Sequence, residues 1–423
     1  MSNSFSKEER VAFEDILEGF QDLLVLSRHV SVYNTDQTMM ARTNDTIWRP
    51  MPYIAQSQTS APGTPVTYQN MTQLSVPSTI GFSQTVPWTM TTLDLRDALQ
   101  EGRLGESAKQ KLASDINVAI MNTAAAQGTL VVPIVGAAGD YDDVSLCDTI
   151  MNEQGVPDYD RFLGLSSRDY NGMAGNLAVA TRSFGNPKSN LAYERNQVGM
   201  VAGFDTYKFD YANRIAIAAG GVTTIDTSGA QAQYVPQATS TSVGGQINVD
   251  NRYQTVTVSN SAGVVAGDAF TIDGIYAVHH ITKVSTGQLK TFRVISVPAG
   301  GVTLVISPPI IAATAPATDA ELQYKNVELV TAAGAAALNW LNTGASAINV
   351  FWQKDSLEIL PGRYAIPSDA GTAVMRATTD QGVELVMQKF YDIDSMIIKY
   401  RLDTLFGVVN KQPEMSGILL FNQ

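Results

Sequence analysis

The sequence of 423 residues contains one cysteine, Cys147, and three histidines, His29, His279 and His280. A single cysteine excludes an intrachain disulfide, which is typical of chains that fold in a reducing compartment. Three histidines leave few possible bases for Ser-His-Asp or Cys-His catalysis. Cys147 lies between Leu146 and Asp148 without a basic neighbour that would activate it, and we interpret it as buried. We expect no enzyme activity, no catalytic residue and no cofactor.

Basic residues are also scarce. The chain has 28 Lys and Arg against 40 Asp and Glu, a formal net charge of -12. Binding to nucleic acid through phosphate neutralisation needs clustered cations, so we expect at most loose contact with DNA. The start of the chain lacks the pattern of a signal peptide, and no run of 18 apolar residues occurs, so we expect neither export nor membrane insertion.

Charge of either sign is rare between residues 215 and 320, which hold five acidic and four basic residues. Strand-like runs occur at 246–259, 269–275, 289–297 and 302–307. Asp273-Gly274, residues 298–301 and Pro308-Pro309 are interpreted as turns or stops. This stretch predicts a compact β module inserted into a host domain whose halves precede and follow it.

The first 35 residues predict an amphipathic helical arm. Apolar residues recur at helical spacing, and six acidic residues outnumber three basic ones. The recurring positions are Phe13, Ile16, Leu17, Phe20, Leu23, Leu24 and Ser27. The acidic remainder is either a solvated helix face or a surface that attracts a basic partner.

Residues 46–88 contain a high density of proline that excludes a helix. Such a long irregular stretch is typical of a projecting loop or a linker. Its apolar residues favour an extended two-stranded flap that covers another subunit. They include Ile54, Val66, Tyr68, Leu74, Ile80 and Phe82.

A long helix is predicted from about 92 to 127, with Thr92 as N-cap and Gly128 at its end. Gly102 and Gly105 make a kink or break near 102–105 an open alternative. Further predictions are strands at 130–135, 348–352, 383–390, 393–409 and 418–421, and helices at 144–153 and 332–341. Residues 156–212 are expected to mix loops with short helices. The fold class is therefore α+β, with antiparallel sheet near the C-terminus.

Two clusters could hold a metal. Asp140, Asp142, Asp143 and Asp148 fit no complete cation loop, and a solvated acidic loop is the preferred interpretation. His279 and His280 are consecutive, so in a strand they point to opposite faces. A metal-dependent hydrolase that uses the aspartates stays open as an alternative function, but no metal site is expected.

Four stretches, in this order along the chain, resemble one family. They are NDTIWRPM at 44–51, TLDLRD at 92–97, VAGFD at 201–205, and INVDNRYQTVTV at 247–258 with NVFW at 349–352. The family is the major capsid, or coat, proteins of short-tailed double-stranded DNA phages of the Salmonella and Shigella type. These proteins have the Hong Kong 97 phage capsid fold with an inserted β-barrel domain.

The resemblance implies six named parts. They are an N-terminal arm at 1–35, an E-loop at 36–90, a spine helix at 91–127, a peripheral P-domain at 128–200 and 391–423, an A-domain at 201–222 and 328–390, and an insertion domain at 223–327. One departure is the segment 238–246, ATSTSVGGQ, which is uncharged where relatives carry charges that bridge neighbouring capsomers.

The resemblance also implies a function. Copies of the chain would assemble into pentamers and hexamers of an icosahedral shell around double-stranded DNA, in the host cytoplasm, with a portal protein at one vertex. A basic scaffolding protein would contact Glu14, Asp15 and Glu18. Anchors between subunits would be Trp48, Ile54, Val66, Tyr68, Leu74, Phe82 and Trp88. The alternative is a β-rich tail or surface component that binds glycans.

Overall fold

The structure is a computed structural model of the chain. It describes all residues except 1–4, 6, 34–45, 53, 54, 56, 58–60, 64, 67, 92–97, 140, 181–186, 210–212, 222, 227–233, 330–334, 367–370 and 423. The chain forms two compact units. Unit 1 comprises Met1–Ile47, Ser78–Met121 and Leu357–Val409, and unit 2 comprises Trp48–Pro77, Asn122–Ser356 and Asn410–Gln423.

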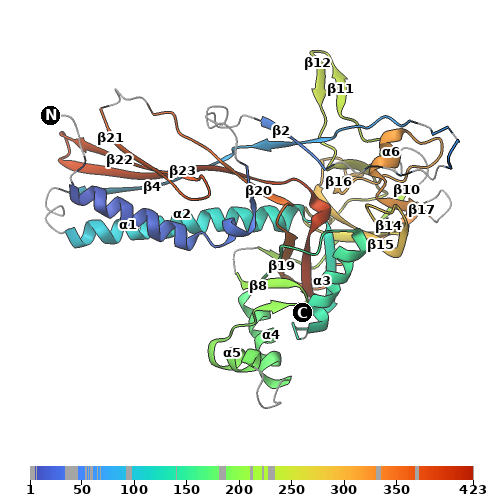
Figure 1. The fold of residues 1–423 in the computed structure, drawn as a ribbon, viewed down its shortest axis with the longest axis horizontal. Coiled ribbons are helices and arrows are strands. Elements are labelled where there is room, and N and C mark those ends of the chain that lie inside the picture. The colour runs from blue at the N-terminus through green and yellow to red at the C-terminus, as the bar shows by residue number, and fades with distance from the viewer. Residues whose placement is uncertain are drawn as a thin grey trace. The chain divides into compact units, whose positions relative to one another are not determined.

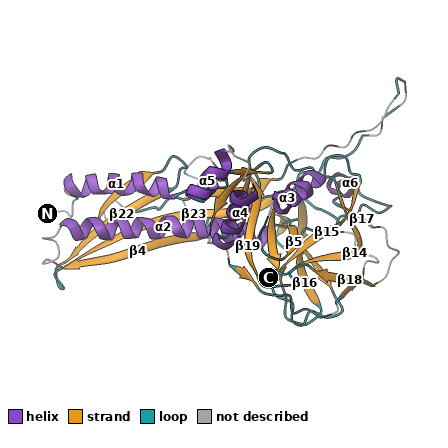
Figure 2. Cartoon of the chain, turned by 90° about the horizontal axis from the view of Figure 1, so that it is seen from below, coloured by secondary structure: helices purple, strands orange, loops and turns teal. Residues whose placement is uncertain are grey.

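Unit 1 is built from two helices and a sheet of long strands. The helices α1 (Lys7–Leu23) and α2 (Ala98–Gln127) lie side by side along the strands (Figures 1 and 2). The sheet order is β1-β20-β23-β22-β21, and β4 also pairs with β23. The elements are η1 (Leu26–His29), β1 (Ser31–Val32), β4 (Phe82–Thr91), β20 (Leu357–Pro361), β21 (Ala373–Thr378), β22 (Glu384–Asp392) and β23 (Ile397–Asn410).

Most of the apolar stripe predicted in the arm is buried: Phe13, Ile16 and Phe20 on α1 are all less than 10% exposed, whereas Leu23 is 37% exposed. The helix α2 runs through Gly102 and Gly105 without a break. A Cβ atom at Gly105 would lie 2.7 Å from Cδ1 of Ile16, so this glycine allows the close approach of α1. The predicted N-cap Thr92 lies outside the described residues.

Unit 2 contains a host sheet in the order β5-β24-β19-β6-β8-β7, with β9 also paired to β19. Its core joins residues far apart in sequence, such as Leu130, Leu163, Phe351 and Phe421. The strands predicted at 130–135, 348–352 and 418–421 are confirmed. The elements are β5 (Leu130–Val135), α3 (Tyr141–Gln154), β6 (Arg161–Leu165), α4 (Ser167–Ala180), α5 (Pro187–Arg195), β7 (Met200–Val201), β8 (Phe204–Lys208), β9 (Arg214–Ile215), β19 (Ser346–Gln353), η4 (Pro413–Met415) and β24 (Ser416–Asn422).

The predicted β module forms a second sheet in unit 2, in the order β10-β18-β14-β15-β16-β13, with β17 also paired to β14. A core of its own includes Phe270, Phe292, Val294 and Leu304. We call residues 223–341 the insertion module. Its elements are β10 (Thr224–Asp226), β13 (Gln254–Thr257), β14 (Ala269–Val278), β15 (Ser285–Ser296), β16 (Thr303–Ser307), α6 (Asp319–Tyr324), β17 (Val327–Leu329) and β18 (Ala335–Trp340).

The structure corrects three predictions in this region. Asp273-Gly274 is not a turn: β14 continues through it, and the register with β15 shifts there while Gly274 has a φ of +77°. Within the helix predicted at 332–341, the described residues Ala335–Trp340 form β18 instead, because residues 335–337 pair with β10 and residues 338–340 pair with β14. The module also does not end at residue 327, since β17 and β18 complete its sheet. Tertiary pairing overrides the helix propensity of alanine.

The remaining strands form two small pairs: β2 (Thr46–Pro50) with β3 (Ser75–Thr79), and β11 (Thr239–Ser242) with β12 (Gly245–Asn248). The boundary expected between residues 390 and 391 lies inside β22. This strand pairs with β23 from Leu385 to Asp392, so residues 357–409 stay together in unit 1. Apart from these two boundaries, the six named parts stay an expectation. No described helix is long and apolar enough to cross a membrane.

Candidate assembly surfaces

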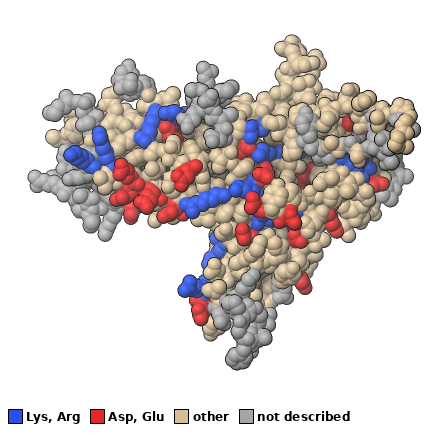
Figure 3. Space-filling view, viewed as in Figure 1, with Lys and Arg blue, Asp and Glu red and all other residues tan. Residues whose placement is uncertain are grey.

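The helix α1 separates its charges from its apolar stripe. Glu14, Asp15 and Glu18 are exposed, and acidic side chains gather over this helix (Figure 3). Glu9 behaves differently: it is 8% exposed and binds Lys389 and the hydroxyl of Tyr400 on the sheet. The exposed carboxylates are therefore available to a partner, whereas Glu9 fixes the helix to its own unit.

The segment between β2 and β3 is uncharged from residue 50 to residue 74 and exposes apolar surface. Tyr68 is 94% exposed and Val66 is 46% exposed. Trp48 is half-buried, and Ile54 lies outside the described residues. Leu74 is only 2% exposed and packs with Ile311 and Tyr324 of the same chain, so its surface is already used.

Two further candidate anchors pack within unit 1. The ring of Phe82 stacks on Phe406 at 5.3 Å between centroids, and the ring of Trp88 stacks on Tyr400 at 5.5 Å. Both aromatic pairs join β4 to β23. These contacts give Phe82 and Trp88 a role in stabilising the long sheet. Only the part of each side chain that stays exposed is available to a neighbouring subunit.

The hairpin of β11 and β12 projects from the insertion module (Figure 1). All residues from Thr241 to Asn248 are exposed, and Val243 at the turn is fully exposed. Because the hairpin is uncharged, an interface formed by it would depend on shape and apolar contact rather than on ion pairs.

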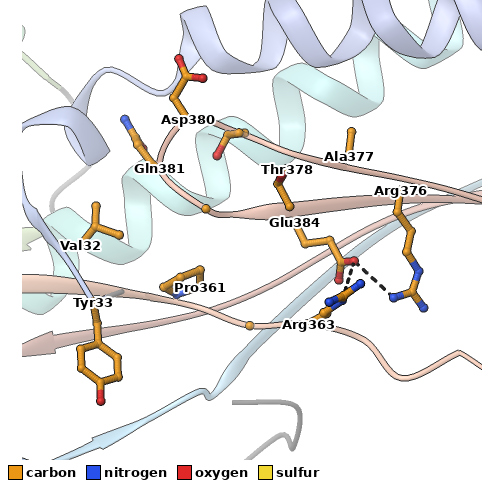
Figure 4. A pocket seen from close by; sticks show the side chains of 13 residues that line it. Val32, Tyr33, Pro361, Arg363, Arg376, Ala377, Thr378, Asp380, Gln381 and Glu384 are labelled. Atoms are coloured by element: carbon orange, nitrogen blue, oxygen red, sulfur yellow. Dashed lines mark hydrogen bonds and ion pairs between the residues drawn. The ribbon is translucent and has the colours of Figure 1, made fainter. Parts of the chain in front are cut away.

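A polar cavity of about 680 Å³ opens in unit 1 between the end of β20 and the β21–β22 hairpin. Its charged centre is Glu384, which is 3% exposed and lies 3.4 Å from Arg376 and 3.8 Å from Arg363 (Figure 4). The backbone nitrogen of Tyr364 donates to the same carboxylate. The two guanidinium groups compensate the buried charge of Glu384, so we interpret this arrangement as a structural ion cluster.

Sequence reasoning missed a set of buried cations on β15. Lys290 is fully buried and donates to Glu414 at 2.6 Å and to Gln154 at 2.7 Å. Arg293 is 1% exposed and donates to the carbonyls of Ala125, Gly128 and Gly267. The available signal was the presence of Lys290 and Arg293 inside an apolar strand pattern, where a cation needs a partner.

The cysteine and two of the clustered aspartates have structural roles. Cys147 is buried, and desolvation together with Asp143 and Asp148 raises the pKa of its thiol, which opposes reactivity. Asp148 pairs with the buried Arg161, and Asp143 accepts from the backbone nitrogen of Gly139. No cluster of three or more possible metal ligands occurs among the described residues.

Nδ1 of His279 accepts from two backbone nitrogens of the following turn, those of Ile281 and Thr282. His280 is buried beside Glu414, with 3.3 Å between Nε2 and Oε2. Both histidines lie just after the end of β14, so the strand alternation expected for them does not apply, but each imidazole contacts different groups.

An exposed acidic helix, an uncharged extended segment and a projecting hairpin are features of a structural protein that assembles with other chains. Residues 1–422 match the profile of the P22 coat protein, gene protein 5, and the chain belongs to this family. The α+β phage capsid fold is confirmed. The protein is a major capsid protein of the virion that forms an icosahedral shell, and it is not an enzyme.

Three of the solved structures to which the chain is similar come from phages. A chain of Mycobacterium phage Che8 has 10% identity and a TM-score of 0.44, over 94% of this chain and 89% of that chain. A chain of the satellite phage P4 procapsid has 6% identity and a TM-score of 0.40, over 97% and 91%. The CUS-3 coat protein I-domain has 35% identity and a TM-score of 0.22, over 29% of this chain and 96% of that chain.

Proposed function

We propose that the shell is tiled by pentamers and hexamers in which the segment between β2 and β3 covers a neighbouring copy. The exposure of Tyr68 and Val66 on an uncharged segment carries this proposal. Subunits with a net charge of -12 repel one another, so association requires apolar burial. Repeated contacts of about 25 cal/mol per Å² make a weak pair interaction strong in a closed shell.

Tyr68→Asp tests this contact, because it places a charge where apolar surface is to be buried. We expect at least a tenfold loss of shells with an unchanged amount of folded soluble subunit, counted by negative-stain microscopy after gradient sedimentation. Tyr193→Asp is the matched control, since Tyr193 is 84% exposed on α5, away from the segment. Normal shell yield from Tyr68→Asp would contradict the assignment.

The same proposal includes a scaffolding protein with a basic contact region that binds the exposed carboxylates of α1. Support comes from the exposure of Glu14, Asp15 and Glu18 on one helix. Such surface ion pairs are screened by salt, so recruitment should weaken as ionic strength rises. A portal protein at one vertex and assembly in the host cytoplasm rest on the family resemblance alone.

Glu14→Lys tests the scaffold surface. We expect severalfold less scaffolding protein in sedimented particles, measured by gel densitometry. Glu194→Lys on α5 makes the same charge change on another exposed helix and should behave as the parent protein. Equal incorporation of scaffolding protein into both variants would exclude α1 as its site.

A further inference from the structure

A small, partly open space lies in unit 2 where the insertion module meets the host sheet. The cavity measures about 50 Å³, and its walls include His280 and Asn326 of the module and Glu414 of η4. A space of this size holds water rather than a larger ligand. The residues around this space join the insertion module to the host sheet, and we call them the junction. The charged groups among them affect the stability of the contact between module and host.

The only carboxylate charge at this junction, among the described residues that line the cavity, belongs to Glu414. Its Oε1 atom accepts from Nζ of Lys290 at 2.6 Å and from Nδ2 of Asn326 at 3.2 Å. Desolvation raises the pKa of Glu414, but the opposite effects of Lys290 and then His280 together outweigh it. The pKa of Glu414 is therefore lowered from 4.5 to about 2. Glu414 is thus ionised near neutral pH, and Lys290 already compensates its charge.

His280 occupies the other side of the same carboxylate. It is 9% exposed, its backbone nitrogen donates to the carbonyl of Gln154, and its Nε2 atom makes no hydrogen bond among the described residues. The titratable groups that face it are Glu414 on η4, Lys290 on β15, and Lys283 and His279 in the segment after β14. Three of these four groups oppose a positive charge on the imidazole.

Arg252 also lines the cavity, and its charge is compensated by Asp250, which accepts three hydrogen bonds from Nε and Nη2 of its guanidinium group. A proton on His280 would therefore add a further buried cation beside Glu414, whose carboxylate is already paired with Lys290. Burying an uncompensated charge is strongly unfavourable.

We propose that His280 is an acid-sensitive switch at the junction between the insertion module and the host sheet. The neutral imidazole lets the module close on the host near neutral pH, and protonation opens the contacts that Lys290, Thr291 and Arg293 make with host residues. Those contacts include the hydroxyl of Thr291 with the carbonyl of Thr129 at 2.8 Å.

The pKa of His280 supports this geometry. Burial lowers it from 6.5 to about 4, although Glu414 acts in the opposite direction. His280 binds its proton at a higher pH in the unfolded or opened chain than in the closed one. The stability that the neutral imidazole contributes is therefore fully present above pH 6.5 and is lost as the pH falls toward 4. The contribution of Glu414, whose pKa is lowered, is retained above pH 4.5, so the window between 6.5 and 4.5 isolates His280.

Hydrogen exchange of the full, unassembled subunit tests the proposal, with rates corrected for the intrinsic effect of pH. We expect the opening constant of amides in β15 to rise on the order of 50- to 100-fold between pH 7.5 and 4.5 in the parent protein. His280→Gln should reduce this rise to less than fivefold. His279→Gln is the matched control and should keep the rise of the parent protein.

An equal rise in His280→Gln and in the parent protein would overturn the proposal. If His280→Gln does not fold, the imidazole carbon shifts of the parent protein decide, with His279→Gln and His29→Gln assigning the other two signals. A His280 signal that stays neutral down to pH 5 supports the switch. Protonation above pH 6 with β15 still protected would also overturn it.

Discussion

The two units of this capsid subunit differ in the charged side chains that they bury. The charged side chains buried in the described part of unit 1 are all carboxylates, and Glu9, Glu384 and Asp403 are among them. Unit 2 also buries carboxylates, but it adds four cations: Arg161, Arg252, Lys290 and Arg293. The difference shows two ways of tying segments together. In unit 1 the buried carboxylates pair with cations that reach solvent, whereas in unit 2 enclosed cations bind side-chain carboxylates and backbone carbonyls.

In unit 1 the cations that compensate these carboxylates keep part of their surface in water. The exposed side-chain fractions are 16% for Lys389, 29% for Arg376 and 51% for Arg401. Long cationic side chains reach solvent easily, so losing one such contact leaves a cation that water can hydrate.

In unit 2 the cations are enclosed and bind carbonyl oxygens. Arg293 reaches the carbonyls at the end of α2, and Arg252 donates to the carbonyl of Asn410. Removing such a cation leaves these buried acceptors without their hydrogen-bond donor. We therefore expect larger losses from substitutions in unit 2.

Arg293→Met should have the largest effect, because it leaves three backbone carbonyls without their donor. We expect a loss of about 4 kcal/mol in the free energy of unfolding of unit 2. Urea unfolding of the soluble subunit measures it. Arg168→Met, an exposed position on α4, is the control. A change of less than 1 kcal/mol would show that buried cations are not what distinguishes unit 2.

Lys290→Met should follow, with a loss of about 3 kcal/mol, because Glu414 keeps a buried charge without its partner. The pKa of Glu414 is about 2 with Lys290 present, so its stabilisation is complete above pH 4.5 and lost as the pH falls toward 2. Without Lys290 this loss should begin at higher pH, as unfolding at a series of pH values would show.

The double variant Lys290→Met, Glu414→Gln removes both charges and should recover a large part of the loss. Equal instability of the single and double variants would mean that packing, and not charge, explains the effect of Lys290.

Glu384→Gln should cost less, about 1 to 2 kcal/mol in unit 1, because both arginines around it reach solvent. Asp380→Asn changes the same charge at an exposed position of the same cavity and should change stability by less than about 0.5 kcal/mol. A loss from Glu384→Gln as large as that from Arg293→Met would remove the contrast between the two units.

Glu14→Gln should have the smallest effect on stability, within about 0.5 kcal/mol, since its carboxylate is exposed on α1. Thermal unfolding of the subunit measures it. A clear destabilisation would show that Glu14 contributes to the stability of unit 1 and would weaken the proposal that it binds a partner.

Much of the fold could be predicted from local patterns. The buried stripe of α1 with Phe13 and Phe20, the strand at 348–352 and the long strands near the C-terminus followed from apolar periodicity. Local rules failed at Gly274, which allows a bulge inside β14 instead of a turn, and in the alanine-rich β18, whose strand state comes from pairing with β14.

The candidate surfaces were predictable only in part. The sequence indicated exposed carboxylates on the arm and an uncharged segment with Tyr68 and Val66, and both are exposed in the structure. It could not show that Leu74 is buried in its own chain, because the partners Ile311 and Tyr324 are more than 200 residues away in sequence.

The amino-acid sequence by itself determined the acidic net charge, the absence of disulfides, the amphipathic arm, the inserted β-rich stretch and the family resemblance, because these depend on composition and local order. Only the tertiary structure decided where the scarce charges of that stretch go. Lys290 and Arg293 bind partners on η4 and α2, and His280 lies beside Glu414. Burial and partner distance set the stability of such groups, and both arise when segments distant in sequence pack together.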